Sequence, residues 1–228
     1  MVEGHIYTIQ FLYQKHMYEQ ERERLVLNLN REGYIKTERV KQAFLTVPRE
    51  AFLPDLLKDY AYIDTPLDIG QGQTISAPHM VAIMCESLDI KDDQKILEIG
   101  TGSGYHAAIV AQLVGEAGHV YTIERFESLA KKAKENLKQI GYTNIIVNVG
   151  DGSCGLPLYQ PYDRIYVTCA APYIPQPLID QLQDCGKLLV PIGDMYCELI
   201  LLEKEKGKSV IHRLGGCVFV PLVGKYGH

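Results

Sequence analysis

The apolar positions of residues 37–47 recur with the period of an α-helix, and the chain before them is also helix-prone. Residues 17–32 are charged and helix-prone, and the segment TERVKQAFLTV then carries its apolar side chains on one helical face. These side chains are Val40, Ala43, Phe44 and Val47. Thr37 is suited to cap the start of this second helix, and Pro48 ends its pattern. We therefore predict a helical N-terminal lobe over residues 1–65, packed with residues 66–228 as one compact unit.

The chain beyond this lobe alternates between short apolar runs and amphipathic helical segments. The runs typical of strands are KILEIG (95–100), HVYTIE (119–124), NIIVNVG (144–150), DRIYVT (163–168) and KLLVPI (187–192). The helical segments are expected from residue 77 and over 105–115, 127–141 and 175–186, and the last three end at a glycine. Strands that alternate with helices at this spacing predict an α/β fold with a doubly wound, mostly parallel sheet.

The C-terminal tail lacks this alternation. CELILLEK (197–204) leads to a turn at KGKS (206–209), and the apolar runs VIHRL (210–214) and CVFVPLV (217–223) follow. Strands with no helix between them indicate antiparallel pairing. We therefore predict an antiparallel β edge at the C-terminal end of the sheet.

Composition excludes several classes of protein. Hydrophobic residues make up 46% and charged residues 22% of the 228 residues, which is ordinary for a soluble globular protein. The net charge of −5 argues against nucleic-acid binding, and no apolar run approaches the roughly 18 residues that would span a membrane. The N-terminus carries Glu3 and no basic stretch, so no signal peptide is expected. The six cysteines form no C-x-x-C pair, which favours reduced thiols in the cytoplasm and no metal site.

The segment LEIGTGSGYHAA carries the most informative glycines of the chain. They follow the pattern G-x-G-x-G at Gly100, Gly102 and Gly104, and Tyr105 stands where a dinucleotide-binding loop needs its third glycine. Glu98 lies in the strand just ahead of this loop, where it would repel a pyrophosphate. It suits the cationic amino-acid end of S-adenosylmethionine instead. The loop therefore favours that cofactor over NAD.

Two further acids follow the next strands. Glu124 ends the second strand, where it can accept both hydroxyls of a ribose, and Asp151 follows the third, where it can approach an adenine amino group. Because parallel strands end at one edge of the sheet, Glu98, Glu124 and Asp151 are expected to converge on one crevice. Two plainer interpretations stay open: Glu124 as a solvated strand end, and Asp151 as a turn or cap residue before Gly152.

These segments together resemble the protein-L-isoaspartate O-methyltransferase family of class I, Rossmann-like, S-adenosylmethionine-dependent methyltransferases. From about Gly33 to Gly224 the family pattern is met in order by VPREAFLP, GQTISAPHM, LEIGTGSGYHAA, GDG, YDRIYVTCAAP, GKLLVPIG and FVPLVG. The glycine loop alone would identify only a class I methyltransferase, and GQTISAPHM is far more specific.

The resemblance implies an enzyme of protein repair. It would transfer a methyl group from S-adenosylmethionine to the α-carboxylate of L-isoaspartyl residues in damaged proteins and peptides. The positions that match the family's cofactor site are Thr74, Ile75, Ser76, Glu98, Gly100, Gly102, Ser103, Gly104, Glu124, Asp151 and Gly152. Ser76 also matches the residue assigned to catalysis in the family, whereas its local sequence Ser76-Ala77-Pro78 suits a helix N-cap. Thr168 ends a strand at the crevice and is a candidate substrate contact, or an ordinary strand residue.

Four other functions compete with this one. The first is that of another class I methyltransferase, which acts on a different small or peptide acceptor. An NAD-dependent oxidoreductase is disfavoured by Tyr105 and Glu98. A nucleic-acid amine methyltransferase would carry an Asn/Asp-Pro-Pro-aromatic tetrad where this chain has TCAAPY. A non-catalytic binding module could keep the same fold. The missing Ser-His-Asp or Cys-His arrangement fits a carboxylate acceptor, because a carboxylate is already ionised at pH 7.

Overall fold

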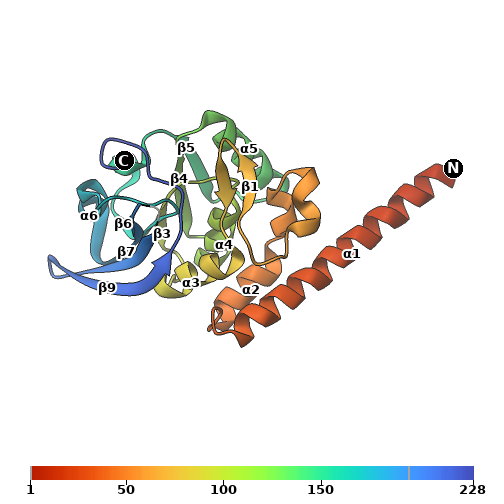
Figure 1. Ribbon diagram of the computed structural model, residues 1–228, viewed down its shortest axis with the longest axis horizontal. Coiled ribbons are helices and arrows are strands. Elements are labelled where there is room, and N and C mark those ends of the chain that lie inside the picture. Colours follow the sequence, from red (N-terminus) through yellow and green to blue (C-terminus); the bar gives the residue numbers. More distant parts are fainter. Residues whose placement is uncertain (1, 195) are drawn as a thin grey trace.

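A seven-stranded sheet forms the centre of the molecule, in the order β5-β4-β3-β6-β7-β8-β9 (Figure 1). The computed structural model describes residues 2–194 and 196–228, with side chains from residue 14 onward. The strands are β3 (Lys95–Ile99), β4 (His119–Glu124), β5 (Ile145–Val149), β6 (Tyr162–Val167), β7 (Leu182–Gly193), β8 (Cys197–Glu205) and β9 (Lys208–Cys217). Strands β3 to β7 pair in parallel, and β7, β8 and β9 pair antiparallel. The predicted sheet and its antiparallel C-terminal edge are confirmed.

Helices cover both faces of the sheet, as a doubly wound fold requires. The α-helices are α1 (Val2–Arg31), α2 (Glu38–Thr46), α3 (Pro78–Leu88), α4 (Tyr105–Val114), α5 (Glu127–Gln139) and α6 (Gln176–Gln181). Short 3₁₀ helices are η1 (Arg49–Phe52), η2 (Asp55–Tyr60), η3 (Gly152–Cys154) and η4 (Pro157–Tyr159). Because successive strand residues point to opposite faces, Ile96 joins the core shared with α3 and α4, while Leu97 joins the core shared with α6.

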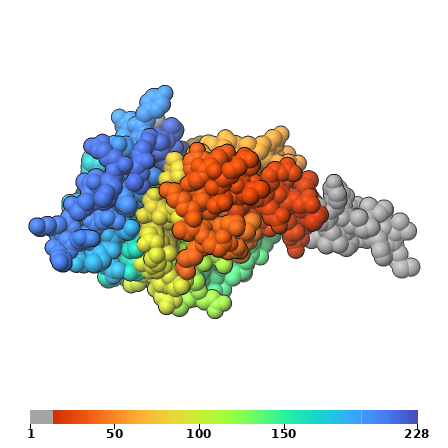
Figure 2. All heavy atoms as spheres, turned by 90° about the horizontal axis from the view of Figure 1, so that it is seen from below, coloured from red at the N-terminus to blue at the C-terminus, as the bar shows by residue number. Residues whose placement is uncertain are grey.

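The N-terminal helices pack on one side of this body. In Figure 1, α1 runs outward so that the N-terminus lies far from the sheet, and in Figure 2 the chain after residue 13 lies beside α3. Helix α2 packs against α3 and α4, and Phe44 meets the ring of Tyr105 edge-on at 6.4 Å. The described residues include no helix that combines the length and apolarity of a membrane span.

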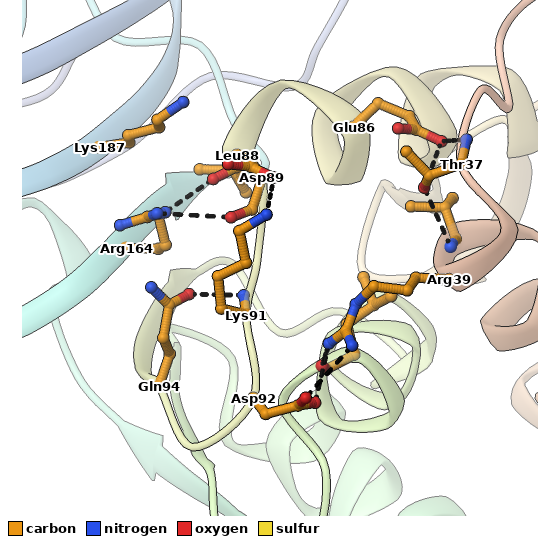
Figure 3. Close-up of polar contacts among 12 residues, drawn as sticks. Thr37, Arg39, Glu86, Leu88, Asp89, Lys91, Asp92, Gln94, Arg164 and Lys187 are labelled. Carbon is orange, nitrogen blue, oxygen red and sulfur yellow. Dashed lines mark hydrogen bonds and ion pairs between the residues drawn. The ribbon is translucent and has the colours of Figure 1, made fainter.

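Polar contacts tie the start of α2 to the rest of the molecule. Thr37 caps α2 as predicted, because its hydroxyl accepts a hydrogen bond from the first turn. Glu86 of α3 accepts from the backbone nitrogen of Thr37 at 2.8 Å, and Arg39 pairs with Asp92 at 2.9 Å (Figure 3). Helices α1, α2, η1 and η2 thus occupy most of residues 2–60, and the division into a lobe over residues 1–65 and a domain over 66–228 stays a prediction.

The last predicted helix is shorter than expected. Instead of running over 175–186, it ends where Leu182 begins to pair with Tyr162 of β6. Lys204 of β8 donates to the carbonyls of Ile179 and Leu182, at 3.2 and 2.7 Å, and so satisfies carbonyl groups at the end of the helix. Both partners are remote in sequence, so the local helical pattern could not reveal the early end.

The predicted strand CVFVPLV is also wrong beyond Cys217. Residues 218–228, here called the C-terminal strap, leave the sheet, and Pro221 forms an isolated parallel bridge with Ala170, just beyond the carboxyl end of β6. Ala170 donates to the carbonyl of Val220, and Leu222 donates to the carbonyl of Ala170, both at 2.7 Å. Pro221 between them has no N–H to offer to a sheet.

A short hairpin ahead of α3 was not predicted. It consists of β1 (Leu67–Gly70) and β2 (Gln73–Ile75), which pair antiparallel. The turn holds Gly70, Gln71 and Gly72 at φ of 91°, 57° and 67°, a region that glycine enters at little cost. The segment GQGQTIS therefore forms a turn and a strand that end directly at Ser76.

Candidate active site

A pocket opens at the carboxyl ends of β3, β4 and β6. This is where ligands bind in open α/β sheets. The predicted site residues that line it are Thr74, Ile75, Ser76, Gly100, Gly102, Ser103, Glu124, Gly152 and Thr168. Glu98, Gly104 and Asp151 do not line it. The hairpin, the glycine loop and the C-terminal strap thus surround one space.

The glycine loop is built for close approach. Gly100 has φ of 96°, and a Cβ there would lie 2.3 Å from Oγ1 of Thr168. The Thr168 hydroxyl donates to the carbonyls of Gly100 and Ile99, at 2.7 and 3.0 Å, which draws β6 against the end of β3. A Cβ at Gly152 would lie 2.5 Å from Cγ2 of Ile99. Side chains at either glycine would therefore distort the floor of the pocket.

Glu124 is held in place by the loop it faces. Its side chain is buried, and its Oε2 accepts from the backbone nitrogen of Gly102 at 2.9 Å, while Oε1 accepts from that of Phe126 at 3.0 Å. A carboxylate oxygen has two lone pairs, so each oxygen can accept one more hydrogen bond. Glu124 therefore presents a fixed acceptor pair to the pocket, as a ribose would need, and is not a solvated strand end.

Ser76 stands between β2 and α3 and lines the pocket. The N-cap of α3 is Ala77 with Pro78 at the start of the helix, and no cap hydrogen bond comes from the Ser76 side chain. Asp64 caps instead, because its Oδ1 accepts from the backbone nitrogen of His79 at 2.9 Å. The N-cap interpretation of Ser76 is therefore wrong, and its hydroxyl makes no hydrogen bond to the described residues.

Comparison with known proteins agrees with this arrangement. Residues 20–227 match the family model of Protein-L-isoaspartate(D-aspartate) O-methyltransferase. The chain belongs to this family. Among curated relatives, Protein-L-isoaspartate O-methyltransferase of Methanococcus aeolicus is 55% identical over 205 residues, 90% of this chain and 95% of that one. The enzyme of the same name from Hyperthermus butylicus is 54% identical over 220 residues, 92% of this chain and 91% of that one.

A solved structure of the family has the same fold. It is described as a putative protein-L-isoaspartate O-methyltransferase from Plasmodium falciparum in complex with S-adenosyl-L-homocysteine. The two chains superpose with a TM-score of 0.80 at 29% identity, over 89% of this chain and 98% of that one. The class I methyltransferase fold predicted from the glycine loop is therefore confirmed.

Glu98 departs from the sequence-based expectation, because it is fully buried behind the pocket wall. Thr122 donates to its Oε2 at 2.6 Å and Tyr166 to its Oε1 at 2.9 Å. Thr101 does line the pocket. Its hydroxyl lies 2.6 Å from the Thr122 hydroxyl, and so connects to Glu98 only through Thr122. Burial raises the pKa of Glu98 to about 8, although both hydrogen bonds lower it. Of the three acids expected at one crevice, only Glu124 lines it.

The raised pKa of Glu98 predicts a pH dependence of stability. Between the ordinary pKa near 4.5 and the folded value near 8, unfolding releases a proton, so the free energy of unfolding falls as pH rises. Relative to Glu98→Gln, the wild-type protein should lose up to about 1 kcal/mol per pH unit in this window and nothing further above it. Urea unfolding at several pH values measures the difference. Parallel profiles for the two proteins would mean that Glu98 is already ionised in the folded state.

Asp151 serves the C-terminal strap. Its Oδ1 accepts from the backbone nitrogen of Ser153 at 2.9 Å and so caps η3, in line with the plainer interpretation. Its Oδ2 accepts from the backbone nitrogen of Lys225 at 2.8 Å, and the Ser153 hydroxyl accepts from that of Tyr226 at 2.9 Å. A Cβ at Gly224 would lie 1.9 Å from Oδ1. Asp151 therefore anchors the strap and does not line the pocket, and its expected contact with the cofactor stays a prediction.

Several pocket residues were not predicted from the sequence. They are Gln73, Val81, Ile99, Thr101, Tyr105, His106, Ile123, Arg125, Cys169, Val220, Pro221, Leu222 and Val223. The last four belong to the C-terminal strap. The segment FVPLVG, which matches the family pattern, could have identified them, but its apolar run predicts a strand instead. Gly104 was predicted and lies outside the pocket: at φ of 92° it lets α4 begin close to Leu137 of α5.

Proposed function

We propose that this chain transfers a methyl group from S-adenosylmethionine to the α-carboxylate of L-isoaspartyl residues in proteins and peptides. The observation that carries the proposal is the unpartnered hydroxyl of Ser76, which shares one pocket with the glycine loop and Glu124. A reduced, cytoplasmic setting fits the six unpaired cysteines, and peptide rather than nucleic-acid acceptors fit the net charge of −5.

The pocket fits S-adenosylmethionine by its donors and acceptors. Ser103 lines the pocket, and its buried Oγ has no hydrogen-bond partner among the described residues, so we propose that it bonds to the cofactor. Glu124 would hold the ribose hydroxyls, and Gly100 and Gly102 would let the backbone approach the amino-acid portion. When bound, the cofactor supplies a methyl group made electrophilic by its sulfonium.

If Glu124 holds the ribose, replacing it should lower the affinity for the cofactor more than replacing any other carboxylate. Glu124→Ala removes the proposed ribose acceptor, and a hydrogen bond to a charged group contributes roughly 1.5–3 kcal/mol. The affinity for S-adenosylhomocysteine, measured by calorimetry, should therefore fall roughly 10- to 100-fold. Glu124→Gln retains one acceptor and should lose less. Wild-type affinity in Glu124→Ala would move the ribose elsewhere in the pocket.

The pocket lacks a general base, which suits a carboxylate acceptor. Its titratable side chains are Tyr105, His106, Glu124, Arg125 and Cys169. Burial lowers the pKa of His106 to about 3, raises that of Tyr105 to about 12 and raises that of the Cys169 thiol. These groups therefore stay neutral at pH 7, and Glu124 is engaged by the loop. An ammonium acceptor would need a base, whereas a carboxylate with a pKa near 4 needs none.

The protein's contribution is therefore position. Ser76 would donate its hydroxyl to one oxygen of the substrate carboxylate and leave the other oxygen directed at the methyl group. Holding two reactants in line in this way can lower a barrier by several kcal/mol, on the order of 7 or more. The methyl ester then reacts without the enzyme: the following backbone nitrogen attacks the ester carbonyl, methanol leaves, and a succinimide forms. Hydrolysis of the succinimide returns part of the material as normal aspartate.

Transfer of a radiolabelled methyl group tests the function directly. We expect label from S-adenosylmethionine in an isoaspartyl peptide, in a base-labile ester, and little in the same peptide with normal aspartate. The normal residue attaches its carboxyl group through a different bond and would miss the in-line position. Equal labelling of both peptides, or a base-stable product, contradicts the repair function and leaves another methyl acceptor. Binding of S-adenosylhomocysteine with no transfer indicates a non-catalytic binding module.

A further inference from the structure

Arg49 is an unusual cation because it is fully buried and no carboxylate contacts it. It lies in η1 with 0% of its surface exposed. Its Nη2 donates to the carbonyl of Ser76 at 2.9 Å, while Nε and Nη1 have no hydrogen-bond partner among the described residues. The acids nearest in sequence and fold are engaged elsewhere: Glu50 accepts from Tyr62, and Asp64 pairs with His79.

Burying a guanidinium that no carboxylate contacts costs free energy, so the presence of Arg49 at this position calls for a functional explanation. Burial lowers the pKa of Arg49, but a guanidinium stays charged at neutral pH. The ring of Tyr105 offsets part of the cost, because Cζ lies 4.9 Å from the ring centroid. Ser76 and Tyr105 both line the pocket, so the charge of Arg49 lies directly behind this part of its wall.

The pocket itself has no charged side chain at this end. Among its described lining residues, formal charges at pH 7 are carried by Glu124 and Arg125, both at the end of β4. An anion beside Ser76 would therefore meet, apart from the cofactor's sulfonium, the field of Arg49. A buried charge acts over several ångströms because the protein interior screens it weakly.

We propose that Arg49 is a positioning residue that makes the Ser76 end of the pocket selective for a carboxylate. It acts in two ways: Nη2 fixes the backbone that carries the Ser76 hydroxyl, and its buried charge, which no carboxylate contacts, attracts the acceptor's α-carboxylate through Ser76 and Tyr105. The inference rests on the proposed function, since it assigns the carboxylate of the isoaspartyl substrate to this end.

The test compares two peptides that differ only at the reacting group. One is an isoaspartyl peptide, and the other has the α-carboxylate replaced by a carboxamide. Their affinities are measured by calorimetry on the full chain saturated with S-adenosylhomocysteine, for the wild type, Arg49→Met and Arg49→Lys. Lysine keeps the charge, whereas methionine keeps much of the apolar stem without it.

We expect the wild type to prefer the carboxylate peptide, and Arg49→Met to reduce that preference about tenfold, while Arg49→Lys retains most of it. The affinity for S-adenosylhomocysteine should change less than twofold in either variant. If Arg49→Met weakens both peptides equally, Arg49 only supports the loop and the inference is wrong. It is equally wrong if Arg49→Met and the polar variant Arg49→Gln both fail to fold, since the residue is then required for structure. A wild type that binds S-adenosylhomocysteine but neither peptide contradicts the proposed function itself.

Discussion

Ser76→Ala should lower kcat and kcat/KM for an isoaspartyl peptide together, by roughly 10- to 100-fold, because the hydroxyl that would hold the acceptor oxygen in line with the methyl group is lost. The melting temperature should stay near that of the wild type, since the Ser76 side chain forms no cap. Steady-state kinetics and a thermal melt measure the two effects.

Asp64→Ala is the matched control for the same helix terminus. It removes the acceptor of His79 N–H and should cost about 1 kcal/mol of stability. Ser76→Thr keeps a hydroxyl and should recover part of the activity. Wild-type turnover in Ser76→Ala would exclude the serine from catalysis. A drop in stability equal to that of Asp64→Ala would restore the capping interpretation.

Gly100→Ala should be among the most damaging single substitutions in the chain. Its φ of 96° is strained for any residue with a Cβ, and the new Cβ would lie 2.3 Å from Oγ1 of Thr168. Either the loop or β6 must move, so we expect a loss of roughly 3 kcal/mol of stability and no measurable binding of S-adenosylhomocysteine. Urea unfolding and calorimetry provide the two measurements.

Gly141 supplies the control, because it has φ of 88° and nothing lies within 4 Å of the position that a Cβ would take. Gly141→Ala should therefore cost only the conformational strain, about 1 kcal/mol, and leave cofactor binding intact. Thr168→Ala removes the atom that Gly100→Ala would strike, so the double variant should be more stable than the sum of the single effects. Equal costs at Gly100 and Gly141 would mean that contact with Thr168 is unimportant.

Short-range patterns were sufficient for most of the secondary structure. The apolar face of α2 and its cap at Thr37 depend on residues within one or two turns, and both are present. The parallel pairing of β3 to β7 follows from the alternation of strands and helices, whereas the order of the strands was not predicted. The hairpin β1–β2 was missed because strands of four and three residues offer too short a pattern.

Elements that depend on distant partners were the ones predicted wrongly. The early end of α6 needs Lys204 and Tyr162, and the strap needs the backbone of Ala170 and the carboxylate of Asp151. None of these contacts affects the local spacing of apolar residues, from which the elements were predicted. The local pattern therefore predicts a strand in place of the strap, and it does not reveal that Asp151 accepts a hydrogen bond from the backbone nitrogen of Lys225.

The sequence by itself determined the class I fold, the glycine loop, Glu124 and the resemblance that pointed to an isoaspartyl carboxylate. These depend on glycine's freedom at positive φ and on the rule that parallel strands end at one edge. Only the tertiary structure decided which of the three acids lines the pocket. Glu98 is buried behind the pocket wall, and Asp151 binds the strap outside the lining. It also decided that Asp64, not Ser76, caps α3, because the Asp64 carboxylate, 15 residues upstream, accepts the hydrogen bond from the backbone N–H of His79. That long-range contact leaves the Ser76 hydroxyl free beside a buried arginine.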